Sequence, residues 1–214
     1  DFKKFVENNP GYTVISYVNT SAAVKAVTDV VVTSTNARQI VESFPAEEKI
    51  IFGPDRNLGN YINSITGRNM KLWDGACHVH EEFSLEKILD LKKQYPDALI
   101  LAHPECKKVI LMLADKIGST AALLKYATES SAKKFIVATE SGILHEMKKS
   151  NPDKTFIPAP PNDSTCACNE CNFMRLNTMK KLYLTLKNEL PEIKVDKDIA
   201  DRAVLPIKKM LDIS

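Results

Sequence analysis

The sequence lacks any apolar run long enough to cross a membrane, which takes roughly 20 consecutive apolar residues. Its first ten residues, DFKKFVENNP, also lack the basic segment and the apolar segment of a secretory signal peptide. The first absence excludes a membrane-spanning helix within this sequence, and the second argues against secretion. We therefore expect a cytoplasmic protein.

The net charge is also small, because 29 basic residues nearly balance 27 acidic residues and leave a formal charge of +2. Surfaces that bind nucleic acid or anionic membranes usually carry a marked excess of Lys and Arg. We therefore expect no nucleic-acid partner and no membrane partner, which leaves small charged metabolites as ligands. With 44% apolar side chains, 214 residues suffice for one large core or two small ones.

Cysteines are few, and their arrangement does not suit a disulfide scaffold. There are five, an odd number, and three of them lie in the segment CACNEC as Cys166, Cys168 and Cys171. Secreted disulfide-rich domains usually have an even set of spaced cysteines, so this pattern favours metal binding. A zinc site or a redox-active disulfide in CxCxxC are alternatives, although the segment lacks the second CxxC of a structural zinc finger.

What the sequence does contain is an internal repeat with a period of 86 residues. The segments NPGYTVISYVNT and YPDALILAHPEC both run from a proline through an apolar stretch to a polar cluster, and they align Pro10 with Pro96. The same offset aligns Asp29 with Asp115, and the apolar run KIIFG with FIVAT, without a gap. A repeat of this length indicates structurally equivalent units.

The apolar runs in each unit are too uniformly apolar for a sheet with one solvent-exposed face, so we expect parallel strands covered by helices. Helix starts with capping residues separate these runs, for example Asn36 before ARQIVESF and Ser84 in SLEK. The predicted fold is α/β, with two pseudo-repeated three-layer α/β/α units, short parallel sheets, and two C-terminal helices near 177–190 and 196–212. The expected boundaries are 1–80 and 81–172 for the units and 173–214 for the C-terminal helices.

The repeat also relates two of the cysteines. Cys77 and Cys171 each precede an amphipathic segment and lie 94 residues apart, which is one period plus eight residues. An extra loop of proline and small polar residues at 158–165 can account for these eight residues. One period before Cys77, a matching cysteine would fall at position −9, before Asp1. This extrapolation predicts a preceding unit that the sequence does not include.

Polar side chains follow the first apolar run of each unit. His103 and Glu105 follow ALILA, and Tyr17 and Asn19 occupy the equivalent positions 86 residues earlier. Ligands of open parallel sheets bind at the carboxyl ends of strands, and a carboxylate beside an imidazole can share proton transfers. We therefore expect both strand ends to face one central site. An N-cap and its neighbour is the alternative interpretation of His103 and Glu105.

Eight motifs occur in order along nearly the whole sequence: YVNTSAAVKA, VTSTNA, GPDRNLGNY, WDGACHVHEEF, HPECKKV, ADKIGST, TESGILHEM and CNFMRLNT. With these motifs the sequence resembles the quinolinate synthase family and lacks the first of that family's three domains. The resemblance implies condensation of iminoaspartate with dihydroxyacetone phosphate to quinolinate, in NAD biosynthesis. It also implies one [4Fe-4S] cluster held by three cysteines, with a fourth iron that acts as a Lewis acid.

The resemblance also implies roles for individual residues. Cys77 and Cys171 match two of the three cluster ligands, and the family's first cysteine falls before Asp1. Glu105 matches an acid or base of the dehydration. The other matches are His103, Tyr17 and His80 as catalytic residues, and Asn19, Ser34, Ser119 and Thr120 as substrate-binding residues.

Three of these residues have a simpler interpretation. Ser34, Ser119 and Thr120 lie where a strand is expected to turn into a helix, and hydroxyls there are commonly N-caps. Such helix starts also attract phosphate and carboxylate groups. Their equivalent positions in the repeat, together with the resemblance, favour binding of the anionic substrates.

The resemblance has consequences beyond the site. We expect the C-terminal helices at 173–214 to pack toward the missing first domain. A chain with two of three cluster ligands would hold the cluster poorly and be inactive alone. An L-aspartate oxidase or dehydrogenase would supply the iminoaspartate. Without the resemblance, the residues are also compatible with two other functions. One is a non-catalytic metal-binding or redox-sensing module that uses CxCxxC, and the other is a phosphate-binding α/β protein without metal.

Overall fold

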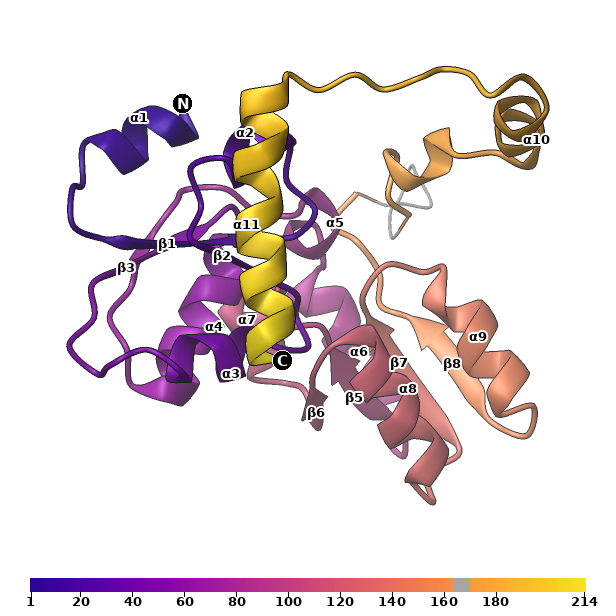
Figure 1. Cartoon of the computed structure of the whole chain (residues 1–214). Coiled ribbons are helices and arrows are strands. Elements are labelled where there is room, and N and C mark those ends of the chain that lie inside the picture. The colour runs from indigo at the N-terminus through magenta and orange to yellow at the C-terminus, as the bar shows by residue number, and fades with distance from the viewer. Residues whose placement is uncertain (164–169) are drawn as a thin grey trace.

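The protein consists of two α/β units followed by two C-terminal helices, in a computed structural model that describes residues 1–163 and 170–214 (Figure 1). Cys166 and Cys168 lie outside these residues, so their predicted alternatives stay open. No helix in the described part of the chain combines the length and apolar character that a membrane span requires.

Each unit contains a sheet of four parallel strands with the same strand order. The order is β2-β1-β3-β4 in the first sheet and β6-β5-β7-β8 in the second. The predicted α/β fold with two repeated units is therefore confirmed. The strands are β1 (Thr13–Tyr17), β2 (Val30–Val32), β3 (Ile50–Gly53), β4 (Lys71–Leu72), β5 (Leu99–Ala102), β6 (Lys116–Ile117), β7 (Lys134–Ala138) and β8 (Thr155–Pro158).

Helices connect successive strands and cover both faces of the sheets (Figure 1). Of the two caps named from the sequence, Ser84 accepts a hydrogen bond from the amide of Lys87 as expected. Asn36 occupies the N-cap position of α3 (Ala37–Glu42) but makes no side-chain cap bond, because its Oδ1 accepts from the amide of Thr33 instead. The helices are α1 (Phe2–Glu7), α2 (Ala22–Lys25), α3 (Ala37–Glu42), α4 (Arg56–Thr66), α5 (His78–Glu81), α6 (Leu85–Gln94), α7 (Lys108–Leu111), α8 (Thr120–Glu129), α9 (Ile143–Ser150), the short 3-10 helix η1 (Met174–Leu176), α10 (Met179–Asn188) and α11 (Lys197–Ile213).

The repeat extends to individual hydrogen bonds. In the first unit the amide of Val14 donates to Oδ2 of Asp29 at 2.7 Å. In the second unit the amide of Ile100 donates to Oδ2 of Asp115, also at 2.7 Å. Both pairs join the central strand to the turn before its neighbour, and they are related by the 86-residue period. The two units therefore share a detailed structure as well as a topology.

Both faces of the second sheet are buried, as the uniformly apolar runs predict. Side chains alternate across a strand, and neighbouring residues of β5 belong to two different apolar clusters. Ile100 packs in one cluster with Ile136, and Leu101 packs in the other with Val137. This two-sided burial keeps the strand ends in fixed positions relative to the loops that follow them.

The two C-terminal helices differ in what they contact. α11 crosses the first unit and packs on α2 and β2, where Met210 joins the first unit's core (Figure 1). Its end is held by Gln39, whose Nε2 donates to the carbonyl of Ile213 at 2.8 Å. α10 stands apart and has no buried residue among those described. The predicted packing of these helices toward a further domain stays a prediction.

Candidate functional site

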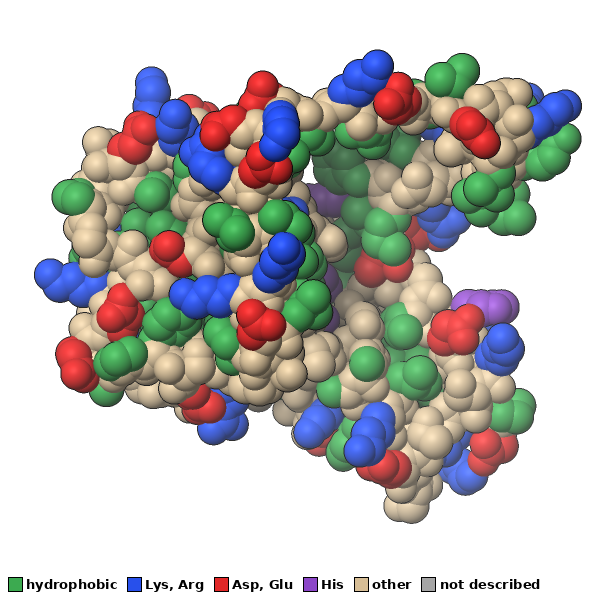
Figure 2. Space-filling model, viewed as in Figure 1, with side chains coloured by type: hydrophobic (Ala, Val, Ile, Leu, Met, Phe, Trp, Pro, Cys, Tyr) green, Lys and Arg blue, Asp and Glu red, His purple; other side chains and the backbone are tan. Residues whose placement is uncertain are grey.

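The carboxyl ends of strands from both units open into one cavity of about 970 Å³. In Figure 2 a hollow between the units contains histidine side chains. Parallel strands end on the same edge of a sheet, so the loops after β1 and β5 are brought to this place. The predicted site residues that line the cavity are Tyr17, Asn19, Ser34, Cys77, His80, His103, Glu105, Thr120 and Cys171.

Ser119 is the predicted site residue that does not line the cavity. Its buried side chain caps α8 and accepts a hydrogen bond from the amide of Ala122 at 3.3 Å. Thr120, the next residue, does line the cavity. The capping role that the sequence offered as an alternative is thus observed at Ser119, and a substrate contact there stays a prediction.

Cys77 lies at the N-cap position of α5, where the chain turns from an extended segment into a helix. Burial raises the pKa of its thiol above the usual value, and hydrogen bonds from the amides of His80 and Val79 offset part of that rise. Amides at a helix start stabilise a thiolate. Cys77 therefore combines a partly buried sulfur with donors that favour its ligand form.

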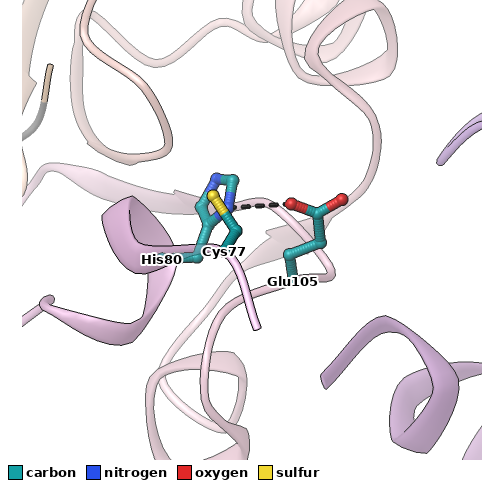
Figure 3. Close-up of side chains that lie close together, drawn as sticks. All are labelled: Cys77, His80 and Glu105. Atoms are coloured by element: carbon teal, nitrogen blue, oxygen red, sulfur yellow. Dashed lines mark ion pairs between the residues drawn. The ribbon is translucent and has the colours of Figure 1, made fainter. Parts of the chain in front are cut away.

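His80 and Glu105 approach each other next to Cys77 (Figure 3). Nδ1 of His80 lies 3.0 Å from Oε2 of Glu105, and Nε2 of His80 lies 3.2 Å from the hydroxyl of Thr139. One ligand atom from each of Cys77, His80 and Glu105 falls within 4.8 Å of the others. A thiol and an imidazole from the start of α5 thus meet a carboxylate from the loop after β5.

The imidazole of His103 stacks on that of His80, with ring centroids 4.7 Å apart and planes inclined by 14°. The pKa of each ring is lowered to about 4, mainly by burial and for His103 also by repulsion from His80. Burial raises the pKa of Glu105, which the neighbouring His103 partly offsets. At neutral pH both imidazoles are therefore neutral, and each can accept a hydrogen bond at one ring nitrogen and donate one from the other.

These pKa shifts give a direct test. We expect His80 and His103 to remain neutral on acidification until about pH 4, as followed by the ring nitrogen shifts of histidine-labelled protein in NMR. Because folding lowers both pKa values from 6.5, their contribution to stability is lost as the pH falls from about 6.5 to 4. Titration of either ring near pH 6.5 would contradict the buried geometry.

Asp55 acts in the opposite direction over part of that range. Burial raises its pKa from 3.8 to about 6, so its contribution to stability grows as the pH falls from about 6 to 4. The pH dependence of unfolding should therefore be shallower than the two imidazoles alone would produce. The ring titrations, which report single groups, are the cleaner measurement.

The first unit supplies Tyr17 and Ser34 from neighbouring strand ends. Burial raises the pKa of the Tyr17 phenol, and hydrogen bonding to Ser34 offsets part of the rise. Glu105 of the second unit raises it as well, which reflects how closely the two units approach. The expectation that both strand ends face one site agrees with this arrangement.

Cys171 reaches the cavity from the segment before η1. It packs with Cys77 against the same apolar cluster of the second unit, and its amide donates to Oε1 of Glu140 at 3.3 Å. Cys106, by contrast, is fully buried and donates to the carbonyl of Ala138 at 3.3 Å. Of the cysteines in the described ranges, Cys77 and Cys171 therefore line the cavity.

Sequence reasoning missed four polar residues of the lining: Asp55, Thr139, Glu140 and Glu146. Asp55 stands at the start of α4, where its Oδ1 accepts a hydrogen bond from the amide of Leu58 at 2.7 Å. Thr139 and Glu140 directly follow β7. Their position after a parallel strand was the available signal, as it was for His103 and Glu105.

The side chains in the cavity suit a metal centre with thiolate ligands. Two partly buried cysteines line one cavity, as expected for a cluster bound between separate elements. Nδ1 of His80 is buried, and although Glu105 is near, no aligned hydrogen bond reaches it from the described residues. An unpaired buried nitrogen is costly unless a further group meets it.

Comparison with known proteins agrees with these features. A family model described as "Quinolinate synthetase A protein" matches residues 1–212. Curated proteins named quinolinate synthase from Chloroherpeton thalassium and Microcystis aeruginosa are each 54% identical to this chain over 213 and 214 residues. A third, from Thermosynechococcus vestitus, is 52% identical over 213 residues.

The matches cover 100% of this chain and 66%, 67% and 67% of those three relatives. The chain thus spans about two thirds of the length of the curated relatives it matches. The match is unbroken through both units and through α10 and α11, so the family resemblance of the motifs is confirmed at the level of the whole chain. This chain belongs to the quinolinate synthetase A protein family.

Proposed function

We propose that this chain is part of a quinolinate synthase, which condenses iminoaspartate with dihydroxyacetone phosphate to quinolinate, phosphate and water in the cytoplasm. The observation that carries the proposal is the meeting of Cys77, His80 and Glu105 within 4.8 Å in a chain of this family. A thiolate ligand beside an acid-base pair is what a metal-assisted dehydration requires. An L-aspartate oxidase or dehydrogenase supplies the iminoaspartate.

Cys77 and Cys171 would hold two irons of a [4Fe-4S] cluster, which when bound supplies a Lewis acid for the dehydration steps. The other chemistry falls to residues of this chain. Glu105, with a raised pKa, exchanges protons with substrate carbon and oxygen atoms. His103 and His80 are neutral between turnovers and relay a proton by accepting it at one ring nitrogen while donating one from the other. Tyr17 orients the reacting group from the opposite unit.

Substrate binding uses hydroxyls, an amide and helix starts. Ser34 and Thr120 lie in the cavity wall at the beginnings of α3 and α8, and Asn19 lies beyond β1. Free amides at helix starts and neighbouring hydroxyls suit the carboxylates of iminoaspartate and the phosphate of dihydroxyacetone phosphate. Ser119 would contribute through the backbone that it fixes as the cap of α8.

The remaining third of the relatives' length would supply the third cysteine and cover α10. This helix and the segment after it expose large apolar side chains that a solvent-facing surface seldom gathers. Among them Met179 is 80% exposed, Leu186 73% and Ile193 85%. We propose that a further α/β domain packs there and that this chain alone is inactive.

Anaerobic iron and sulfide analysis tests the proposal on this chain and on a chain extended to the full length of its relatives. We expect about four irons and a broad visible charge-transfer band in the extended protein, and far less iron in this chain. Cys77→Ser should remove the band, whereas Cys106→Ser, at the buried cysteine, should keep it. An extended protein that binds no iron, or zinc instead, would refute the proposed function.

A further inference from the structure

Two carboxylates outside the acid-base set hold the backbone at the two cavity cysteines. In the first unit, Oδ2 of Asp55 accepts a hydrogen bond from the amide of Cys77 at 2.8 Å. The other oxygen of Asp55 accepts from the amide of Leu58 at 2.7 Å, which caps α4. One carboxylate thus joins the start of a helix to a cysteine 22 residues further along the chain.

The second unit repeats this arrangement. Oε1 of Glu140 accepts from the amide of Cys171 at 3.3 Å, and Oε2 accepts from the amide of Gly142 at 2.7 Å, next to the start of α9. Here the carboxylate and the cysteine are 31 residues apart. The two pairs therefore share a pattern: one oxygen on the following helix start and one on a cysteine amide.

The positions of the two carboxylates are equivalent in the fold. Asp55 lies two residues after Gly53, the end of β3, and Glu140 lies two residues after Ala138, the end of β7. β3 and β7 occupy the same place in the two sheets. The same contact therefore arises twice, independently, at equivalent strand ends.

Helix capping alone does not account for this geometry. A cap needs one side-chain oxygen, and Ser, Thr or Asn provide it as well as Asp. Asp55 is 5% exposed, and it stands close enough to Cys77 that its negative charge raises the thiol pKa, which opposes thiolate formation. What Asp55 offers in spite of this charge is a second acceptor oxygen, which a Ser or Thr cap lacks and which here binds the amide of Cys77.

We propose that Asp55 and Glu140 are positioning residues, a pair of equivalent carboxylate clamps that fix the backbone at Cys77 and Cys171 so that both thiols face the same point of the cavity. The significance of the two thiols as cluster ligands rests on the proposed function. The clamps themselves belong to this chain without any bound group, so they can be tested separately. Charge-assisted hydrogen bonds of this kind are stronger than neutral ones, which suits them to holding a loop.

Amide hydrogen exchange at single-residue resolution tests the clamps on this chain. Asp55→Ser keeps a capping oxygen for α4 but is too short to reach Cys77, and Glu140→Ala removes the second clamp. We expect exchange of the Cys77 amide to accelerate about tenfold or more in Asp55→Ser only, and that of the Cys171 amide in Glu140→Ala only. Asp74→Ser and Glu129→Ala, at side chains 93% and 66% exposed, should change neither amide.

The crossed design makes either result informative. Unchanged exchange at both cysteine amides, or equal acceleration at both in each variant, would overturn the clamps. If Asp55→Ser fails to fold, the isosteric Asp55→Asn replaces it. That variant leaves one oxygen for two amides, so either Cys77 or Leu58 must lose protection if the clamp exists.

A second readout concerns the metal in the extended protein. At equal starting iron content, Asp55→Ser and Glu140→Ala should release iron to a chelator several-fold faster than the Asp74→Ser and Glu129→Ala controls. If the unaltered extended protein holds no iron but the exchange effects appear, the proposed function fails and the clamps stand. If it holds iron and the amides are unaffected, the clamps fail and the function stands.

Discussion

Glu105→Gln is expected to lower quinolinate formation by about 10²–10⁴-fold in a protein extended to the full length of its relatives, the range typical for loss of a general acid or base. Gln keeps the shape and one acceptor oxygen of Glu105 but cannot exchange a proton. Because burial raises the pKa of Glu105, the carboxyl is poised to gain and lose a proton closer to neutral pH than an exposed Glu.

The same substitution should leave the fold and the cluster in place. Glu105 is 8% exposed, and replacing a buried ionisable group with a neutral isostere removes a desolvation cost. We therefore expect unchanged iron content and a thermal midpoint within a few degrees of the unaltered protein. Glu86→Gln, at an exposed position of α6, is the matched control for activity. Full activity in Glu105→Gln would remove Glu105 from the chemistry, and loss of iron would assign it a structural role.

The two-unit fold could be predicted because the information lies in local patterns. Apolar runs such as KIIFG and FIVAT form β3 and β7. Asp29 and Asp115, which occupy the same position of the repeat, accept equivalent hydrogen bonds from backbone amides. The same reasoning placed His103 and Glu105 at a strand end that faces the cavity. Repetition made these patterns readable, since each unit supports the interpretation of the other.

The carboxylate clamps could not be predicted in this way. An acidic residue after a strand and before a helix indicates an N-cap, and nothing local reveals that its second oxygen reaches a cysteine 22 or 31 residues away. The repeat period did not help, because Asp55 and Glu140 are 85 residues apart and so differ by one residue from the 86-residue frame. Contacts of this kind depend on how the loops fold back.

The packing partner of α11 could not be predicted from the sequence either. Its amphipathic pattern indicates that one face is buried but does not say against what. In the structure that face lies on α2 and β2 of the first unit, more than 160 residues earlier in the chain. There Met210 joins a core that includes Val31 and Ile40. α11 also ends beside the loop that carries Ser34, because Nδ2 of Asn36 donates to the hydroxyl of Ser214 at 2.9 Å.

Met210→Ala is therefore expected to destabilise the first unit by about 2–4 kcal/mol, since it removes a large side chain from a packed core and leaves a cavity. Met210 is 9% exposed, whereas Leu211, the next residue of the same helix, is 65% exposed. Leu211→Ala should cost no more than about 0.5 kcal/mol, as usual for surface positions. Urea unfolding of both variants, followed by circular dichroism, measures the difference.

The location of the effect matters as much as its size. Hydrogen exchange in Met210→Ala should rise in β1 and β2 and around Ser34, while β5 and β7 keep their protection, because α11 packs on the first unit. Such a pattern would show that the C-terminal helix supports the part of the cavity wall that carries Ser34. If the two variants unfold at the same urea concentration, α11 does not stabilise the first unit, and the first sheet must be stable without it.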